Sequence, residues 1–388
     1  MYAALFLIAG YPAHSACRDC AQPGFGGPGE NRFTAFDPIC RGEFCREPGF
    51  PQVFVNASNL TLFVRVSDLA FGGGFAIERS FNMDDARSGP FGPGWSFNLG
   101  DTVTAEGDGS IVLRRGTGRV DRFAVVAAGG ALAAVTPTSD SLVQNGDGTY
   151  TVRERADGTV RTFSATGSLL SIRYAGGAVV SLEYNAAGRL SAALYRGRQI
   201  QFSFDGPRLS SISDAAGRSV SFSYRSDGRL LRHINSNGQT VAYEYDGAGN
   251  ITSIQNGDNL TAISYDGDPG YSFVSAVTLP DGSTRQYDAP LSPAQIRVRD
   301  GAGDATLYVS STNGLLQSVT DAGGHRISYS YDAAGRRTRT VNGAGEASTF
   351  TYDSSGNLTV ITDSAGNRWT AVYSGNTLTR LNLSLIHI

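Results

Sequence analysis

Residues 241–251 read Val-Ala-Tyr-Glu-Tyr-Asp-Gly-Ala-Gly-Asn-Ile, and this stretch contains the two signals that decide the fold. Large and small side chains alternate from Val241 to Tyr245, which places the large ones on one face of a β-strand. Asp246 and Gly249 then supply the first and fourth positions of a type I turn, a side-chain acceptor followed by a residue that tolerates a positive φ. The stretch predicts a strand, a tight turn and the start of a second strand.

The aromatic residue that ends this strand recurs along the chain at roughly 21-residue intervals, and a fixed period of this length is typical of a stacked or spiralling repeat fold. Each period contains two tight turns of the Asp/Asn-x-x-Gly kind, as at Asp332–Gly335 and Asn342–Gly345. The recurring aromatic positions are Phe163, Tyr184, Phe204, Tyr224, Tyr245, Tyr265, Tyr287, Tyr308, Tyr331, Tyr352 and Tyr373.

We therefore predict an all-β fold, an elongated antiparallel ribbon of β-hairpins. One hairpin cannot bury its aromatic face alone, so consecutive hairpins are expected to pair edge to edge. The apolar pair in the second strand of a unit, such as Leu209 and Ile212, is three residues apart, which predicts a β-bulge or a strong twist there. We interpret the tyrosines as packing residues. The predicted structural positions are Tyr184, Tyr224, Tyr245, Tyr331, Tyr352, Tyr373, Gly188, Gly217, Gly249, Gly335 and Gly356.

The first 50 residues differ in character from the repeats. Residues 1–16 form a short apolar stretch without a basic start, which fits a signal peptide or a truncated leader and is too short to cross a bilayer. Residues 17–50 are rich in Gly and Pro and contain every cysteine of the chain. Two disulfides are the first interpretation in an exported chain, a Cys₄ zinc site is the alternative, and unpaired thiols are the third. The cysteines are Cys17, Cys20, Cys40 and Cys45.

Composition and motifs argue against catalysis and against nucleic-acid binding. The net charge is −3 and the chain has no lysine, which excludes a phosphate-loop lysine and a Schiff-base lysine. We find no nucleophile elbow, dinucleotide fingerprint or zinc-protease motif, and most aspartates stand at turn positions. We expect no cofactor and no metal in the repeats, and we expect His325 to face solvent. None of the histidines has a partner at metal or triad spacing; they are His14, His233, His325 and His387.

Two sets of motifs carry a family resemblance. Tyr245–Ile251, Tyr331–Arg336 and Tyr352–Leu358 resemble the YD repeat of Rhs proteins, wall-associated proteins, insecticidal toxin-complex subunits and teneurins. Some units are degenerate, since Tyr224 is followed by Arg225. Upstream, Gly89–Ser96 and the motifs that precede it are similar to the N-terminal module of bacterial Rhs proteins. We predict that Trp95 anchors the core of this module. Those motifs are Asn59–Leu62, Asp68–Phe71 and Arg79–Asn82.

The resemblance implies a domain order. An Rhs-type N-terminal β module is expected at residues 51–125, YD-type hairpin repeats at 126–380, and a tail that breaks the period, which we interpret as non-native, at 381–388. The resemblance also implies an exported or envelope-located bacterial protein whose repeats form a shell around a C-terminal toxic domain, which these residues do not contain.

Three classes of function stay open at this point. The first is a non-catalytic, encapsulating part of an Rhs-type toxin-delivery protein. The second is a cell-surface or wall-associated repeat protein that binds carbohydrate or another surface ligand. The third is an enzyme built on a β-array, which would need two carboxylates converging in one cleft. The predicted partners are accordingly an enclosed toxin domain or a surface carbohydrate, with no nucleic acid and no transmembrane segment.

Overall fold

A computed structural model describes residues 36–38, 50–125, 132–135, 140–154, 157–268, 271–288, 295–311, 314–354, 356–374 and 377–384. These residues form strands and turns, with no helix among them, so the predicted all-β class is confirmed. In this part of the chain no helix is long and apolar enough to cross a membrane. The strands form two small sheets, a two-stranded ribbon and one sheet of 24 strands.

The N-terminal strands form two separate antiparallel sheets. We call residues 51–125 the N-terminal module. The first sheet has the order β1-β2-β3-β4-β7 and the second has the order β11-β10-β9-β8. The strands are β1 (Phe36–Pro38), β2 (Pro51–Asn56), β3 (Leu62–Ala70), β4 (Ala76–Asn82), β5 (Ser88–Gly89), β6 (Gly92–Pro93), β7 (Trp95–Phe97), β8 (Thr102–Ala105), β9 (Ile111–Arg114), β10 (Val120–Val125) and β11 (Leu132–Ala134).

The remaining strands form the repeat sheet, in which every strand pairs antiparallel with the next one along the chain. They are β12 (Ser141–Gln144), β13 (Tyr150–Arg153), β14 (Val160–Phe163), β15 (Leu169–Arg173), β16 (Val179–Tyr184), β17 (Leu190–Tyr195), β18 (Arg198–Asp205), β19 (Arg208–Asp214), β20 (Ser219–Tyr224), β21 (Leu230–Ile234), β22 (Thr240–Tyr245), β23 (Ile251–Asn256), β24 (Asn259–Asp268), β25 (Tyr271–Thr278), β26 (Thr284–Tyr287), β27 (Gln295–Arg299), β28 (Ala305–Ser310), β29 (Leu316–Thr320), β30 (Arg326–Tyr331), β31 (Arg337–Val341), β32 (Ala347–Tyr352), β33 (Leu358–Thr362), β34 (Arg368–Ser374) and β35 (Thr377–Ser384).

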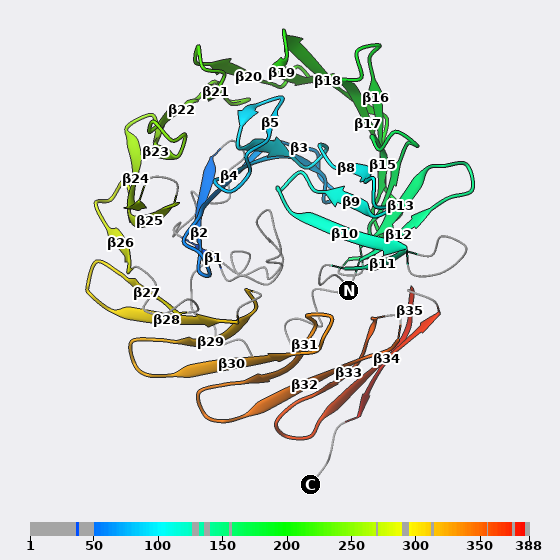
Figure 1. The fold of residues 1–388 in the computed structure, drawn as a ribbon, viewed down its shortest axis with the longest axis vertical. Helices are drawn as coiled ribbons and strands as arrows, with labels where there is room; N and C mark the ends of the chain where they lie inside the picture. Colours follow the sequence, from blue (N-terminus) through cyan, green and yellow to red (C-terminus); the bar gives the residue numbers. More distant parts are fainter. Residues whose placement is uncertain are drawn as a thin grey trace.

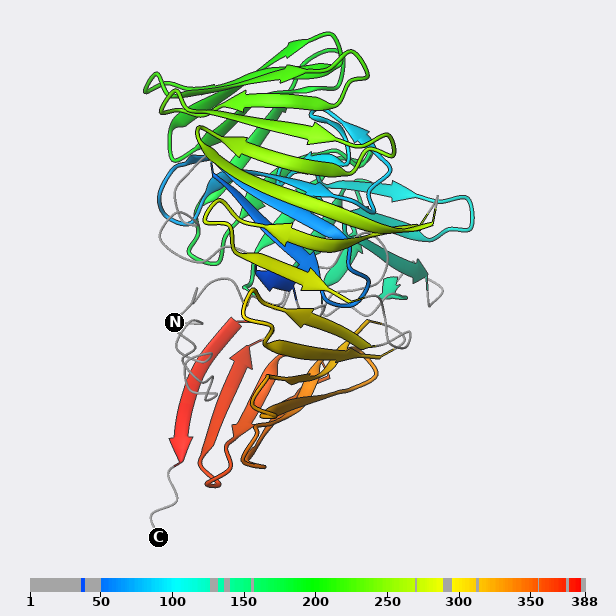
Figure 2. The same ribbon diagram turned by 90° about the vertical axis from the view of Figure 1, so that its left-hand side faces the viewer.

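The repeat sheet is strongly curved, and its strands follow each other around a ring with the N-terminal module inside (Figure 1). Strands β2–β4 lie within the arc formed by β16–β25. Seen from the side, the strands from β29 to β35 extend below the module (Figure 2). The predicted boundary at residues 125/126 falls at the end of β10, which pairs with β11 beyond it. The domain limits therefore remain a proposal.

The turns have the geometry that the Asx-x-x-Gly pattern predicts. At the β16–β17 turn the Gly188 amide donates to the Asn185 carbonyl and the Asn185 amide donates to the Arg189 carbonyl, both at 2.9 Å. Gly188 has a φ of +72°, a value that favours glycine. The degenerate unit at Arg225 keeps this turn, because its Gly228 also has a positive φ of +82°. The glycine, more than the aspartate, therefore defines the turn.

The predicted bulge is confirmed in the second strand of the unit. Phe204 pairs with Leu209, whereas Ser203 pairs with Ser211, so that Ser210 is the extra residue. The same shift precedes Tyr184, Tyr224 and Tyr245. A bulge at this place explains why Leu209 and Ile212, three residues apart, both face the core, and each bulge adds twist to the sheet.

The repeated tyrosines hold the start of the neighbouring strand through their hydroxyl groups. Tyr184 donates to the carbonyl of Leu169 at 2.7 Å, and Tyr331 donates to that of Leu316 at 2.7 Å. In each case the acceptor begins the preceding strand, beside its bulge. The other members of the series are Tyr224 to Leu209, Tyr245 to Leu230, Tyr265 to Ile251, Tyr352 to Arg337 and Tyr373 to Leu358.

We predict that Tyr184→Phe lowers the free energy of unfolding by about 1 kcal/mol, because a partly buried carbonyl loses its hydrogen bond. Denaturant unfolding at neutral pH measures the change. The matched control is Phe204→Tyr, which places a hydroxyl at the equivalent position of the next unit and is expected to leave stability unchanged or to raise it. Equal stability of the Tyr184→Phe variant and the unmodified chain would show that the hydroxyl is dispensable.

Candidate functional site

The N-terminal module and the repeat sheet meet through interleaved aromatic rings. Side chains of β4–β7 and of the loop after β3 lie against inward-facing residues of β17–β22, and all are part of one buried apolar cluster. Such ring pairs stabilise a contact by more than the burial of their apolar area alone. The pairs, with centroid distances, are Phe75–Tyr195 at 4.9 Å, Phe81–Tyr245 at 6.4 Å, Phe91–Phe222 at 5.1 Å, Trp95–Tyr243 at 5.1 Å and Phe97–Phe202 at 6.2 Å.

A buried ion pair lies at the centre of this contact. Arg79 on β4 donates from Nε and Nη2 to the two carboxylate oxygens of Asp68 on β3, at 2.6 and 3.0 Å, and neither side chain is exposed. The guanidinium carbon lies 5.1 Å from the ring centre of Trp95 and 5.0 Å from that of Phe222. Burial is the largest influence and disfavours the charged guanidinium, but Asp68 and Tyr243 together outweigh it and raise the pKa of Arg79, while burial raises the pKa of Asp68. Arg79 is therefore a cation set between aromatic rings of the module and of the repeat sheet.

The repeat sheet adds a buried histidine and two tyrosines next to this pair. His233 on β21 is completely buried, and its Nδ1 lies 3.3 Å from the hydroxyl of Tyr243 on β22. Tyr243 also favours the charged form of Arg79. Trp95 is buried as predicted, and its Nε1 donates to the Tyr245 hydroxyl at 3.0 Å. Trp95 thus joins the module to the repeat sheet, a role that the sequence did not reveal.

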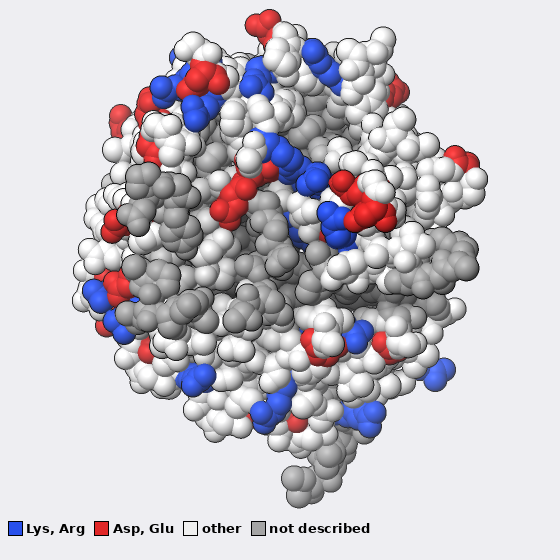
Figure 3. Space-filling model, viewed as in Figure 1, with Lys and Arg blue, Asp and Glu red and all other residues white. Residues whose placement is uncertain are grey.

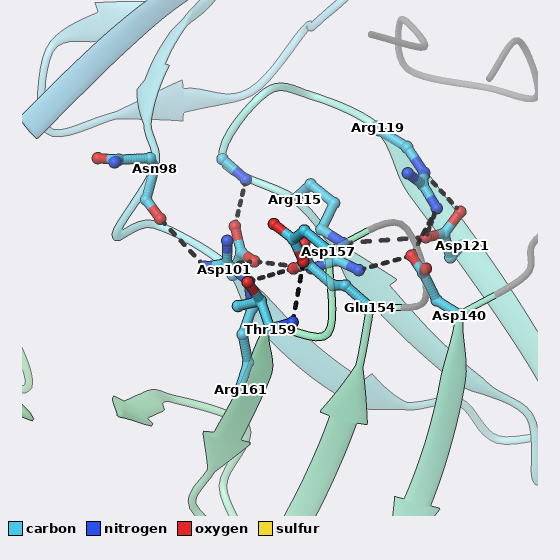
Figure 4. Close-up of polar contacts among 11 residues, drawn as sticks. Asn98, Asp101, Arg115, Arg119, Asp121, Asp140, Glu154, Asp157, Thr159 and Arg161 are labelled. Carbon is cyan, nitrogen blue, oxygen red and sulfur yellow. Dashed lines mark hydrogen bonds and ion pairs between the residues drawn. The ribbon is translucent and has the colours of Figure 1, made fainter. Parts of the chain in front are cut away.

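A second polar cluster connects the β8–β11 sheet to the first strands of the repeat sheet (Figure 4). Arg115, in the β9–β10 turn, contacts Glu154 at 2.7 Å and Asp140 at 3.0 Å. Arg161 on β14 contacts Glu154 at 2.5 Å and Asp101 at 3.4 Å. Arg119 contacts Asp140 at 3.0 Å as well. Carboxylates and arginines therefore alternate, so each charge is compensated by neighbours of opposite sign.

The electrostatics of this second cluster fix the charge of Glu154. Burial alone would raise the pKa of Glu154, but Arg115 and Arg161 outweigh it and lower the pKa to about 2. The carboxylate is therefore ionised and held by two cations, which is unsuited to a general acid. We interpret the cluster as a structural connection between the module and the repeat sheet.

The other predicted positions are distributed over the whole molecule. The four cysteines, Cys17, Cys20, Cys40 and Cys45, lie outside the described residues. The repeat tyrosines and turn glycines lie along the ring and do not converge on one point. His325 is exposed as predicted, with its Nδ1 3.1 Å from a carboxylate oxygen of Asp321. Within the described ranges no group of three or more His, Cys, Asp or Glu residues could hold a metal ion.

The face of the molecule in Figure 3 has a mixed charge distribution. On the face shown in Figure 3, arginines and carboxylates are intermixed, and no extended patch of one sign is seen. This distribution agrees with the small net charge of −3. A protein that binds phosphate backbones needs clustered positive charge. The module–sheet contact is therefore the best-defined candidate site, and its chemistry is that of an internal docking interface.

Together, the ring of β-hairpins and the enclosed module define a class of protein, a β-hairpin repeat shell with an N-terminal module in its concave face. Comparison of the sequence with family models agrees with this class. A Teneurin YD-shell model matches residues 145–268, an RHS Repeat model matches residues 311–347, and a model of a domain of unknown function (DUF6531) matches residues 59–123. The two repeat models support the Rhs/YD-repeat family that the motifs predict, over residues 145–268 and 311–347.

Similar proteins include one curated relative and several solved structures. Double-stranded DNA deaminase toxin A of Burkholderia cenocepacia (strain H111) is 28% identical over 127 residues, which are 32% of this chain and 8% of that protein. The crystal structure of TcdB2-TccC3-TEV aligns with 83% of this chain and 21% of its own, at 11% identity and a TM-score of 0.41. The crystal structure of TcdB2-TccC3 aligns with 83% of this chain and 21% of its own, at 14% identity and a TM-score of 0.31. The chain thus spans a small part of each.

The depressed pKa of Glu154 predicts a dependence of stability on acid. Its folded-state pKa of about 2 lies below the ordinary value of 4.5, so its contribution is fully present above pH 4.5 and is lost as the pH falls toward 2. The loss is on the order of 3 kcal/mol. Glu154→Gln should remove this part of the pH dependence in urea unfolding between pH 5 and 2.5. The exposed Glu183→Gln should behave like the unmodified chain, and an unchanged profile in Glu154→Gln would contradict the assignment.

Proposed function

We propose that this chain is a structural, encapsulating part of an exported Rhs-type toxin-delivery protein and that it has no catalytic role of its own. The observation that carries the proposal is the shape of the repeat sheet. A single antiparallel sheet of 24 strands curves around its own N-terminal module (Figure 1), and many of its apolar side chains belong to the buried cluster shared with that module. A wall of this kind encloses volume.

The two halves of the inner face differ in how completely they are covered. Register places Phe222 and Tyr243 in the first half on the same face as Tyr329 and Trp369 in the second half. Phe222 and Tyr243 are buried under the module, whereas Tyr329 and Trp369 are only partly buried. The second half therefore offers partly accessible apolar side chains on the inside of the wall. Surfaces of this kind bind other polypeptides.

The family relationship supports a toxin-associated role. A curated relative is named as a double-stranded DNA deaminase toxin, and this chain matches only a small part of it. We propose that the matching part is the shell and that the toxic activity belongs to a domain outside it, which would be the partner of this chain. Export to the cell envelope or beyond follows from such a role.

The deciding experiment is to sequence the locus beyond codon 388. We expect the reading frame to continue through further strand–turn units into a domain unrelated to the repeats, followed by a small immunity gene. A frame that ends in repeats or in a surface anchor would overturn the toxin-shell proposal and would favour a surface-binding repeat protein.

A binding experiment addresses the carbohydrate alternative directly. We expect the purified chain to bind no glycan on an array and no peptidoglycan, because in this proposal the aromatic residues of the inner face contact an enclosed polypeptide. If a glycan binds, Trp369→Ala should abolish binding, and Leu194→Ala on the outer face should not, which would assign the inner face to carbohydrate and contradict the encapsulating role.

A further inference from the structure

The residues that contact the N-terminal module in the first half of the repeat sheet have counterparts in the second half. Phe222 contacts Phe91 of the module at a ring-centroid distance of 5.1 Å, and it stands two positions before the strand-ending tyrosine of β20. Tyr329 on β30 and Phe350 on β32 occupy the same place before their own tyrosines. Alternation along a strand therefore puts Tyr329 and Phe350 on the face that the module covers in the first half.

One position on this face changes from leucine to arginine. Arg337 begins β31, and its carbonyl accepts a hydrogen bond from the hydroxyl of Tyr352 at 2.9 Å. The other acceptors of this series are leucine or isoleucine, as at Leu230, which has no exposed surface. The guanidinium carbon of Arg337 lies 5.9 Å from the ring centre of Tyr329 and 5.1 Å from that of Phe350. The wall therefore carries a cation beside two rings of its inner face.

Register continues the apolar face across the neighbouring strands. Phe350 lies opposite Ile361 on β33, and Ile361 lies opposite Trp369 on β34. Trp369 is half-buried and lies opposite Leu383 on β35, which is 53% exposed. None of the strands β29–β35 contains an aspartate or a glutamate, and the carboxylates of residues 316–384 stand in the turns. The strands of this face therefore supply apolar side chains and a cation, but no anion.

The docked module shows what such a face binds. The module presents aromatic rings to the sheet, and its cation, Arg79, lies 5.0 Å from the ring centre of Phe222 and is neutralised by Asp68. In the second half the wall supplies the cation, so the matching surface of a partner presents a carboxylate beside an aromatic ring. A guanidinium has five N–H donors, so that this carboxylate can join the contacts that Arg337 makes within the chain.

We propose that Tyr329, Arg337, Phe350 and Trp369 form a second docking site of the inner face, which binds a polypeptide segment with aromatic side chains next to an aspartate or glutamate. The inference rests on the proposed encapsulating function and names the chemistry of the enclosed polypeptide. The site is continuous with the face that holds the module, because one sheet forms both. The strands that carry it extend below the module (Figure 2). The rings select the aromatic side chains, and the guanidinium selects the carboxylate.

A pair of peptides tests the site in the unmodified chain. The acidic peptide is acetyl-Gly-Trp-Glu-Phe-Gly-amide, and its neutral match has glutamine in place of glutamate. We expect the acidic peptide to bind about five- to tenfold more tightly in isothermal titration calorimetry, because the neutral peptide lacks the charge-assisted hydrogen bond to the guanidinium. Equal affinity for the two peptides, or no binding of either, would overturn the proposal.

Variants separate recognition from folding. Arg337→Leu introduces the residue found at the same place in β33, Leu358, so the variant should fold, and its preference for the acidic peptide should vanish. Arg337→Lys should keep part of the preference, and Phe350→Leu should weaken the binding of both peptides alike. The matched control, Arg189→Leu, removes an exposed arginine that lies 5.6 Å from the ring centre of Phe204, and it should leave both affinities unchanged. A preference that persists in Arg337→Leu would contradict the assignment.

The outcome is independent of the test of the proposed function. If the locus encodes a further domain and the chain does not distinguish the peptides, this inference fails and the encapsulating function stands. If the chain distinguishes the peptides and the locus encodes no further domain, the docking site stands and its partner is a separate polypeptide. Tighter binding of an oligomer of glucuronic acid than of either peptide would assign the face to carbohydrate and overturn the proposal.

Discussion

The structure depends on one constraint, which is that the apolar face of a sheet of 24 strands must be covered. A flat sheet of this size would expose that face to water along its whole length. Curvature turns the face inward, and the N-terminal module then fills the concave side of the first half. Val220, Phe222 and Tyr243 lie in a single buried cluster with module residues such as Phe91 and Trp95. Neither part buries its apolar surface alone.

The curvature has a local origin that recurs along the repeat sheet. A bulge before the strand-ending aromatic residue, as at Tyr184, Phe204 and Tyr224, adds one residue to one of two paired strands, and this increases the local twist. The tyrosine hydroxyl then binds the carbonyl beside the bulge, as Tyr224 binds that of Leu209 at 2.6 Å. Because the bulge recurs in successive units, each adds twist to the ribbon, which curves around the module (Figure 1).

Two polar clusters are retained within this largely apolar arrangement, and both cross the boundary between the module and the repeats. The Asp68–Arg79 pair is balanced and enclosed by rings, and the Arg115–Glu154 cluster alternates in sign. Apolar packing alone is compatible with small shifts of one surface over another, whereas hydrogen-bonded charges require a specific register. We infer that these clusters fix how the module sits in the shell.

The sequence by itself determined the repeat, the turns and the bulge, because these depend on residues close together in the chain. Asp246 and Gly249 define a turn whatever lies beyond them, and the spacing of Leu209 and Ile212 reveals the bulge directly. The pairing of Trp95 with Tyr243 and Tyr245, and of Arg79 with a site beside His233, was decided by the tertiary structure alone. These residues are separated by about 150 positions, and no local pattern encodes which part of a curved sheet a distant module covers. That choice follows from the shape of the curved sheet, since its curvature brings these surfaces together.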